Sequence, residues 1–247
     1  MNADPADQLR LLDVQGTDAR LDQLAHRRAT LPEVAEADRI AAELTQLRDL
    51  LVAAETETSD LEREVAKAES DVEAVRQRAA RDQRRMDAGA VSSAKELEQL
   101  AHEIESLARR RGDLEDLELE VMERLESAQA NVIHLQQRQQ QLAAELADVE
   151  RRRDEQLDGI ARDTAYLTEE RVRLAADLPA DLMALYTKLR ADHDGVGAAA
   201  LRQRRCEGCR LELTAMDLGR IKAAPPEEVL RCEECRRILV RTPESGV

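Results

Sequence analysis

One interval without proline, residues 33 to 178, covers 146 of the chain's 247 residues. Proline lacks a backbone donor and clashes with the preceding helical turn, so its absence permits very long helices. From residue 37 to residue 86, apolar side chains recur in alternating steps of three and four, and only Thr58 and Asp82 are polar. Strands would alternate every second residue, so about seven heptads of this spacing predict a coiled-coil seam. Its positions are Ala37, Ile40, Leu44, Leu47, Leu51, Ala54, Thr58, Leu61, Val65, Ala68, Val72, Val75, Ala79, Asp82 and Met86.

A second seam follows the first within the same interval. Its early positions are Leu97, Leu100, Ile104 and Leu107, and its later positions are Ala128, Val132, Leu135, Gln139, Leu142, Leu146 and Val149. Between them, around Leu114 to Leu125, we expect a three-residue slip in the heptad, which would locally disturb the supercoil. Two apolar seams on one chain predict two helices that cover each other's apolar faces.

The segment between the seams has the residues of a turn, near 87–93. Gly89 can adopt the left-handed conformation that ends a helix. Ser93 and Glu96 have the spacing of a capping box that begins the next helix. Lys95 and Glu96 would then lie exposed at the hairpin tip, so we take Gly89, Ser93, Lys95 and Glu96 as candidate tip contacts for a partner.

The lengths of the two arms also favour a hairpin. Residues 4–88 and 93–177 each contain 85 residues, so two continuous helices would match end to end. Pro32 should interrupt the first arm near residues 30–32, giving a short helix before the long one. After the hairpin, Pro179 suits the start of a further short helix, about Ala180 to Arg190.

All four cysteines form two Cys-x-x-Cys pairs near the C-terminus: Cys206 with Cys209, and Cys232 with Cys235. Two thiolates three positions apart can face one ion from a tight knuckle, where Gly208 fits, and the second pair supplies the other two corners of a tetrahedron. This pattern predicts one structural Zn²⁺. Four thiolates leave no position for a catalytic water, and the βαβ context of a redox motif is missing.

Composition agrees with long helices rather than a large globular core. The chain is 36% charged, has no Trp or Phe and contains two Tyr, as in coiled-coil proteins. We therefore predict a mainly α fold, a long antiparallel two-helix coiled-coil hairpin with a small C-terminal β zinc ribbon. The predicted domains are the hairpin (1–178), a short helix and linker (179–194) and the ribbon (195–247), whose fold the metal should stabilise directly.

Charge is distributed unevenly along the chain. The net charge is −15, yet residues 201–247 hold ten Lys or Arg against eight Asp or Glu. Two interpretations of the arginines near the knuckles stay open: they contact phosphate or an acidic protein, or they are solvated and pair with nearby glutamates and thiolates. No Phe or Trp is interleaved with them, so base stacking is not expected. These arginines are Arg202, Arg204, Arg205, Arg210, Arg231, Arg236, Arg237 and Arg241.

Several classes of function lack their motifs here. The sequence has no Gly-rich phosphate loop, no nucleophile elbow and no His-Glu-x-x-His helix, and its four histidines are scattered. We expect no catalytic residues, no small-molecule substrate and no enzymatic activity. No run of 18 apolar residues occurs, and the first ten residues carry Asp4 and Asp7 instead of a basic signal-peptide start. We therefore expect a cytoplasmic protein without a membrane partner.

Two segments together resemble a bacterial family with an N-terminal coiled-coil hairpin and a C-terminal C4-type zinc ribbon. They are residues 91–104, which follow the predicted turn, and the two cysteine knuckles with the Arg-Arg-Ile-Leu that follows Cys235. The resemblance covers nearly the whole chain and implies that the four cysteines hold zinc. It also implies a cytoplasmic adaptor or chaperone, since family members are connected to transcription, RNA or secretion-apparatus partners. Familiar ribbons often have Cys-Pro-x-Cys-Gly, whereas this chain has Glu233 and Arg236.

The predicted function is a non-enzymatic adaptor or chaperone-like protein. Its ribbon would bind a macromolecule, and its coiled coil would bind a protein partner. The alternative is a zinc-ribbon protein that binds RNA or DNA through the knuckle arginines, with steeply salt-dependent affinity. A third possibility is a structural protein whose coiled coil self-associates.

Overall fold

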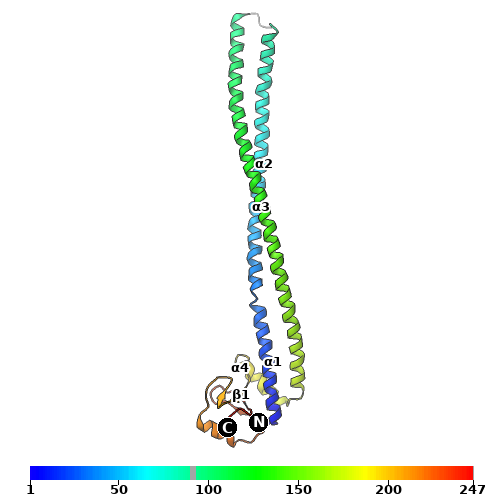
Figure 1. Ribbon diagram of the computed structural model, residues 1–247, viewed down its shortest axis with the longest axis vertical. Coiled ribbons are helices and arrows are strands. Elements are labelled where there is room, and N and C mark those ends of the chain that lie inside the picture. The colour runs from blue at the N-terminus through cyan, green and yellow to red at the C-terminus, as the bar shows by residue number, and fades with distance from the viewer. Residues whose placement is uncertain (90–92, 247) are drawn as a thin grey trace. The chain divides into compact units, whose positions relative to one another are not determined.

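The computed structural model describes residues 1–89 and 93–246 (Figure 1). The chain packs as two units, Met1–Val34 with Arg151–Val247, and Ala35–Glu150. The helices are α1 (Pro5–Ala29), α2 (Pro32–Asp87), α3 (Ala94–Ala176), α4 (Ala180–Asp192) and α5 (Ala215–Ala223). The strands are β1 (Ala198–Arg202), β2 (Arg205–Cys206), β3 (Leu230–Arg231) and β4 (Ile238–Arg241). No helix within the described ranges has an apolar stretch long enough to cross a membrane.

In the unit Ala35–Glu150, α2 and α3 lie side by side and run in opposite directions (Figure 1). Every predicted seam position on α2, from residue 37 to residue 86, is buried or half-buried. Leu61 packs with Val121 and Ala128, while Ala37 and Ile40, earlier on α2, pack in one cluster with Val149, later on α3. The predicted fold class, a mainly α coiled-coil hairpin with a small C-terminal β region, is confirmed.

The expected slip on α3 is wrong. From residue 100 to residue 149 the seam continues in steps of three and four, and it includes the half-buried Glu118. The Arg111 side chain, at the other polar position of the count, is exposed. Glu118 is half-buried although its neighbours Leu117 and Leu119 are exposed. The apolar neighbours hid the true register, because facing residues, and not hydrophobicity alone, decide which side chain turns inward. At the start of the helix, Leu97 is exposed despite its seam position.

The predicted turn residues occupy the ends of both long helices. Gly89 has φ +59°, and its amide donates to the carbonyl of Met86 at 3.2 Å, closing α2. The Ser93 hydroxyl accepts a hydrogen bond from the amide of Glu96 at 3.2 Å, which caps α3. Residues 90–92, including part of the segment that carries the family resemblance, lie outside the described residues.

The first arm is interrupted between α1 and α2. The amide and the hydroxyl of Thr30 both donate to the carbonyl of His26, at 3.0 and 2.9 Å, so they satisfy the last turn of α1. Pro32 then begins α2, where its missing N–H costs nothing. Pro179 occupies the cap position directly before α4, which begins at Ala180 as the sequence predicted.

The sheet has the strand order β2-β1-β4-β3 and lies between two cores. β1 pairs with β4 in parallel, whereas β1–β2 and β3–β4 are antiparallel. Ala198, Ile238 and Val240 face a core shared with α1 and α4. Leu201 and Leu239 face a second core that contains Cys206, Cys232 and α5. Residues adjacent in sequence thus serve opposite faces, as the pleat of a strand requires.

The helix α5 between the two cysteine pairs was not predicted. The hydroxyl of Thr214 caps it by accepting from the amide of Asp217 at 3.1 Å. Its buried residue Ile221 belongs to the core next to the cysteines. Leu211, between the first knuckle and α5, is exposed. A nine-residue helix was missed because its few apolar positions fit a short strand equally well.

Polar side chains of α1 tie the sheet to the helices of the same unit. The side-chain oxygen of Gln15 accepts from the amides of Gly197 and Ala198, and its nitrogen donates to the Gly195 carbonyl. Asp18 accepts hydrogen bonds from the Tyr186 hydroxyl at 2.7 Å and from Arg171 at 2.6 Å. Burial and this bond to Asp18 raise the pKa of Tyr186. These buried bonds set the entry of the chain into β1.

Candidate metal centre and its arginines

Two similar loops hold the cysteines. Cys206 ends β2, and the amide of Arg210 donates to its carbonyl at 2.7 Å. Cys232 follows β3, and the amide of Arg236 donates to its carbonyl at 2.9 Å. In each loop the backbone folds into one tight turn around its Cys-x-x-Cys pair. The second knuckle has Glu233 and Arg236 where familiar ribbons often have Pro and Gly. It nevertheless forms the same backbone hydrogen bond across its turn as the first knuckle.

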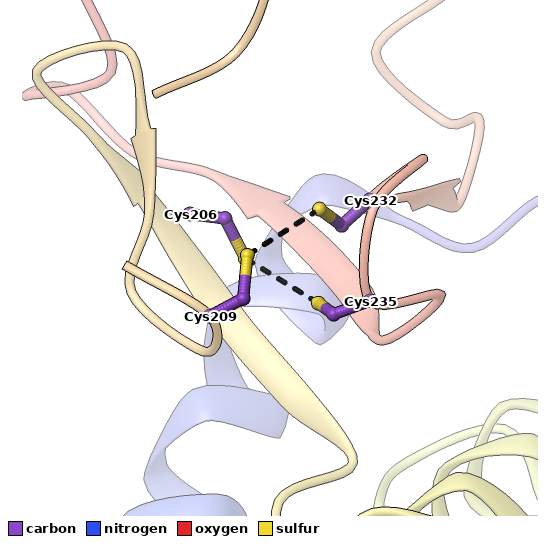
Figure 2. Close-up of side chains that lie close together, drawn as sticks. All are labelled: Cys206, Cys209, Cys232 and Cys235. Atoms are coloured by element: carbon purple, nitrogen blue, oxygen red, sulfur yellow. Dashed lines mark hydrogen bonds between the residues drawn. The ribbon is translucent and has the colours of Figure 1, made fainter. Parts of the chain in front are cut away.

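The four sulfurs surround a common centre. Cys206 Sγ and Cys235 Sγ are 3.8 Å apart, and Cys209 Sγ and Cys232 Sγ are 3.9 Å apart. Figure 2 shows the two pairs pointing toward each other from opposite loops, and all four sulfurs lie within 4.8 Å of one another. A tetrahedral Zn²⁺ with bonds of about 2.3 Å requires sulfurs about 3.8 Å apart. The four cysteines are therefore positioned to bind one zinc ion, as predicted.

Two backbone features make the knuckles possible. A side chain on Gly208 would meet Arg237 Cδ at 2.9 Å and Ala199 Cβ at 3.0 Å, so glycine is required there for close approach. Arg210 and Arg236, each directly after the second cysteine of a pair, have φ of 61° and 59°. Glycine adopts this left-handed conformation without strain, whereas other residues pay about 1 kcal/mol or more. Both knuckles thus hold an arginine where glycine would be less strained.

Burial works against free thiolates at this centre. It raises the pKa of Cys206, despite hydrogen bonds from the amides of Cys209 and Gly208, and it raises the pKa of Cys232. At Cys235, burial also opposes ionisation, but hydrogen bonds from Arg237 outweigh it and lower the pKa. Zinc binds the thiolate form. The positive ion therefore supplies the charge that keeps the buried sulfurs ionised.

Two of the eight predicted arginines have structural roles. Arg237 donates to the carbonyls of Val196 and His193, at 2.9 and 3.2 Å. Arg241 donates to backbone carbonyls of the 221–228 segment, at distances from 2.6 to 3.4 Å. Such bonds link side chains of β4 and the second knuckle to the backbone of other segments. Both guanidinium groups therefore hold the ribbon together.

Three further arginines pair within the ribbon. Arg202 forms an ion pair with Glu244 at 2.8 Å, and Arg236 forms one with Glu233 at 3.0 Å. The Nε of Arg231 donates to the Arg236 carbonyl at 2.7 Å. The interpretation that glutamates of the ribbon neutralise its arginines describes Arg202 and Arg236, whereas Arg231 binds the backbone.

The remaining three arginines surround the first knuckle. Arg204, Arg205 and Arg210 are exposed, and none has an ion-pair partner among the described residues. Arg204 makes a single long bond, from Nε to the Gly246 carbonyl at 3.5 Å. These three guanidinium groups, which form no ion pair among the described residues, are the part of the predicted arginine set that remains available to a partner.

Two of the four predicted tip residues have structural roles, and the other two are exposed. Gly89 and Ser93 have the backbone roles described above. Lys95 and Glu96 are exposed, and neither side chain has an ion-pair partner within the described ranges. They remain available for contact, without a feature that specifies a ligand.

One charged residue near the second knuckle was missed. Arg220, on α5, forms an ion pair with Glu233 and lines a groove of about 470 Å³ together with Arg231 and Arg236. The sequence signal was the Thr214-x-x-Asp217 cap, which begins the unpredicted helix and so determines where Arg220 points.

Comparison with known proteins agrees with both parts of the chain. A family model described as "CT398-like coiled coil hairpin domain" matches residues 14–194, and one described as "C4-type zinc ribbon domain" matches residues 205–239. The uncharacterized protein Rv2229c of Mycobacterium tuberculosis is 39% identical over 241 residues, which cover 98% of each chain. The uncharacterized protein ML1638 of Mycobacterium leprae is 32% identical over 228 residues, covering 88% of this chain and 93% of the other.

Solved structures show the same arrangement. A protein from Mycobacterium smegmatis is 36% identical, with a TM-score of 0.81 over 98% of this chain and 100% of the other. CT398 from Chlamydia trachomatis shares the fold at 19% identity, with a TM-score of 0.66 over 96% of this chain and 98% of the other.

Proposed function

We propose that this chain, which belongs to the family of CT398-like coiled-coil hairpin proteins with a C4-type zinc ribbon, is a non-enzymatic adaptor. Its ribbon binds an acidic macromolecular partner, and its coiled coil binds a protein. The observation that carries the proposal is the group of three exposed arginines around the first knuckle, Arg204, Arg205 and Arg210, which lack ion-pair partners among the described residues. In a chain of net charge −15 such a group favours one orientation of an acidic partner.

The geometry of the metal centre supports a non-enzymatic role. Four thiolates occupy all corners of a zinc tetrahedron, so a water or substrate has no open position. Zinc in such a site stabilises the loops that carry it. We also infer that the protein works in the cytoplasm, because thiolate ligands persist in a reducing compartment.

The test is affinity capture from lysate of the producing cells, divided into nuclease-treated and untreated halves. We expect protein partners that persist after nuclease. The variant Arg204→Ala with Arg205→Ala should retain zinc but lose at least about two-thirds of the captured partner, since it removes two unpaired cations.

A matched control removes two arginines at a position outside the ribbon. Arg109→Ala with Arg110→Ala, on α3, removes the same charge, and we expect capture to be unchanged. Equal capture by the ribbon variant and the wild type would place the contact elsewhere.

Nucleic acid is the second candidate, because guanidinium groups bind phosphate as readily as carboxylate. It predicts that capture collapses after nuclease and that RNA or DNA is recovered from the untreated half. The ribbon contains no Phe, Trp or Tyr to stack on bases, which favours the protein partner.

A further inference from the structure

Within the unit Ala35–Glu150, a groove of about 390 Å³ lies between α2 and α3. Its floor is formed by Val65 and Leu125, and its α3 side by Leu119 and Met122. Leu119 is 58% exposed and Met122 is 44% exposed. Apolar side chains this exposed along one helix mark a surface that another protein can cover.

Another exposed apolar residue lies further along the same side of α3, beyond Glu126 and Gln129. Ile133 is 55% exposed and lies eleven residues beyond Met122, three turns further on the same side of the helix. Leu119 and Ile133 are about 21 Å apart along the helix axis. This length matches about four turns of a partner helix.

Ion pairs between α2 and α3 identify which flank carries the groove. Arg76 and Glu115, 3.7 Å apart, each directly follow a seam residue. Met122, Glu62 and Glu69 also directly follow seam residues, so they belong to that same flank. Glu62 and Glu69 of α2 therefore lie on the same flank of the hairpin as Met122 of α3.

The opposite flank differs in charge. Glu64 and Arg124 each precede a seam residue, and they bridge that flank at 3.5 Å. On the groove flank, Glu62, Glu69, Glu123 and Glu126 have no ion-pair partner in the part of the chain that the structure describes.

The groove also lies in the most acidic part of the hairpin. Residues 55–73 of α2 and 113–131 of α3, here called the acidic belt, pack against each other around Leu61 and Val121. The belt holds fifteen Asp or Glu against three Lys or Arg, a net charge of −12 in a chain of −15. Exposed apolar side chains surrounded by carboxylates are complementary to a helix with one apolar face and a basic rim.

We propose that this groove binds a basic amphipathic helix of a partner protein. The proposal rests on the proposed adaptor function and assigns the face of the coiled coil that it uses. The flexible Met122 side chain can adjust to the apolar residues of the incoming helix. Glu62, Glu69, Glu123 and Glu126 pair with its lysines or arginines.

A second copy of the chain fits the groove less well. Its most basic helical stretch is 76–85, with five arginines and one carboxylate. The seam residues of that stretch, Ala79 and Asp82, already face the hairpin's own interior. The stretch has no free apolar face to place on Leu119 and Met122.

The test uses the full chain and a synthetic peptide of about 18 residues, made of leucine and lysine with leucines on one helical face. A second peptide of identical composition has its leucines scattered around the helix. We expect fluorescence anisotropy to show binding of the amphipathic peptide at least about tenfold tighter than that of the scrambled one. Equal affinities would indicate charge attraction alone and overturn the proposal.

Matched variants locate the binding face. Leu119→Ser with Met122→Ser should weaken peptide binding at least about tenfold. Leu50→Ser with Leu117→Ser removes side chains that are 58% and 49% exposed and directly precede seam residues on the opposite flank. We expect less than about a twofold change from this control. Equal losses in both variants would overturn the assignment, and circular dichroism verifies that each remains helical.

Charge variants test the rim. Glu123→Lys with Glu126→Lys should weaken peptide binding more than Asp49→Lys with Glu145→Lys, which makes the same charge change outside the acidic belt. Equal weakening by both pairs would contradict a role for the rim carboxylates.

The ribbon proposal and the groove proposal can be overturned independently of each other. Arg204→Ala with Arg205→Ala should leave peptide binding unchanged, so a lost ribbon partner with intact peptide binding would overturn only the ribbon assignment. Intact partner capture without peptide binding would overturn only the groove assignment. Sedimentation that shows dimers in wild type and monomers in Leu119→Ser with Met122→Ser would assign the groove to a second copy and overturn the partner helix.

Discussion

At the scale of single residues, the ribbon accepts backbone strain where it presents arginines. Arg204, Arg210 and Arg236 all have φ between 59° and 67°, a conformation in which glycine is the unstrained choice. Strain at exposed positions persists where a side chain has a use. Arg204 and Arg210 are two of the three arginines without ion-pair partners around the first knuckle, which supports their part in the proposed binding.

Arg210→Gly separates this strain from the arginine's function. We expect the free energy of unfolding to stay equal or rise by up to about 1 kcal/mol, because the left-handed strain disappears. Partner capture should fall, because a guanidinium is lost. Both tyrosines, Tyr166 and Tyr186, belong to the unit that contains the ribbon, so tyrosine fluorescence in urea reports its unfolding.

Arg205→Gly is the control for that measurement. Arg205 lies in β2 with an ordinary φ and no ion-pair partner among the described residues. Glycine there should lower the free energy of unfolding by about 0.5–1 kcal/mol. A larger loss from Arg210→Gly than from Arg205→Gly would mean that the Arg210 side chain stabilises the knuckle.

At the scale of elements, the hairpin seam tolerates polar residues at chosen positions. Asp82 is only 8% exposed, and Arg85 approaches its carboxylate at 3.6 Å from the solvent side. Glu118 occupies a half-buried seam position on α3 without interrupting the heptad. Buried polar residues reduce stability but oppose alternative registers.

Asp82→Leu should therefore stabilise the hairpin. We expect the free energy of unfolding to rise by about 1–2 kcal/mol, because a desolvated carboxylate is replaced by an apolar side chain of similar size. Urea unfolding followed by circular dichroism at the helical band measures the change. Glu98→Leu, at an exposed position of α3, should leave the free energy of unfolding almost unchanged. A destabilised Asp82→Leu protein would show that the Arg85 pair outweighs the cost of burial.

At the scale of the whole molecule, metal and charge belong to different parts of the chain. All four cysteines lie in the unit that contains the ribbon, and the acidic belt lies in Ala35–Glu150. Residues 201–247 carry a small excess of basic residues, whereas the belt has a net charge of −12. An acidic partner and a basic partner can thus be bound without competition for the same residues.

Removing zinc should affect one unit more than the other. A strong chelator removes the ion that links both knuckles. We therefore expect unfolding followed by tyrosine fluorescence to occur at a lower urea concentration. The hairpin contains no cysteine, and most of the helical circular dichroism should persist. Restoring zinc should reverse the shift. Complete loss of helical signal on chelation would show that the hairpin depends on the ribbon.

The sequence alone predicted the features that depend on local spacing. The heptad positions of α2, the caps at Gly89 and Ser93 and the zinc ligands all follow from residues a few positions apart or from two pairs of one chemical type. Local geometry decides these features, because helical periodicity, left-handed glycine and thiolate coordination are properties of short segments. The predicted domain division at residues 178 and 195 stays a prediction.

Only the tertiary structure decided which similar residues do different work. Arg237 and Arg241 bind backbone carbonyls, whereas Arg205 and Arg210, equally close to the cysteines in sequence, face solvent. The parallel pairing of β1 with β4, the inward turn of Glu118 and the exposure of Leu119 likewise depend on residues far along the chain. Burial is a property of the neighbours that folding brings together, so no local pattern specifies it.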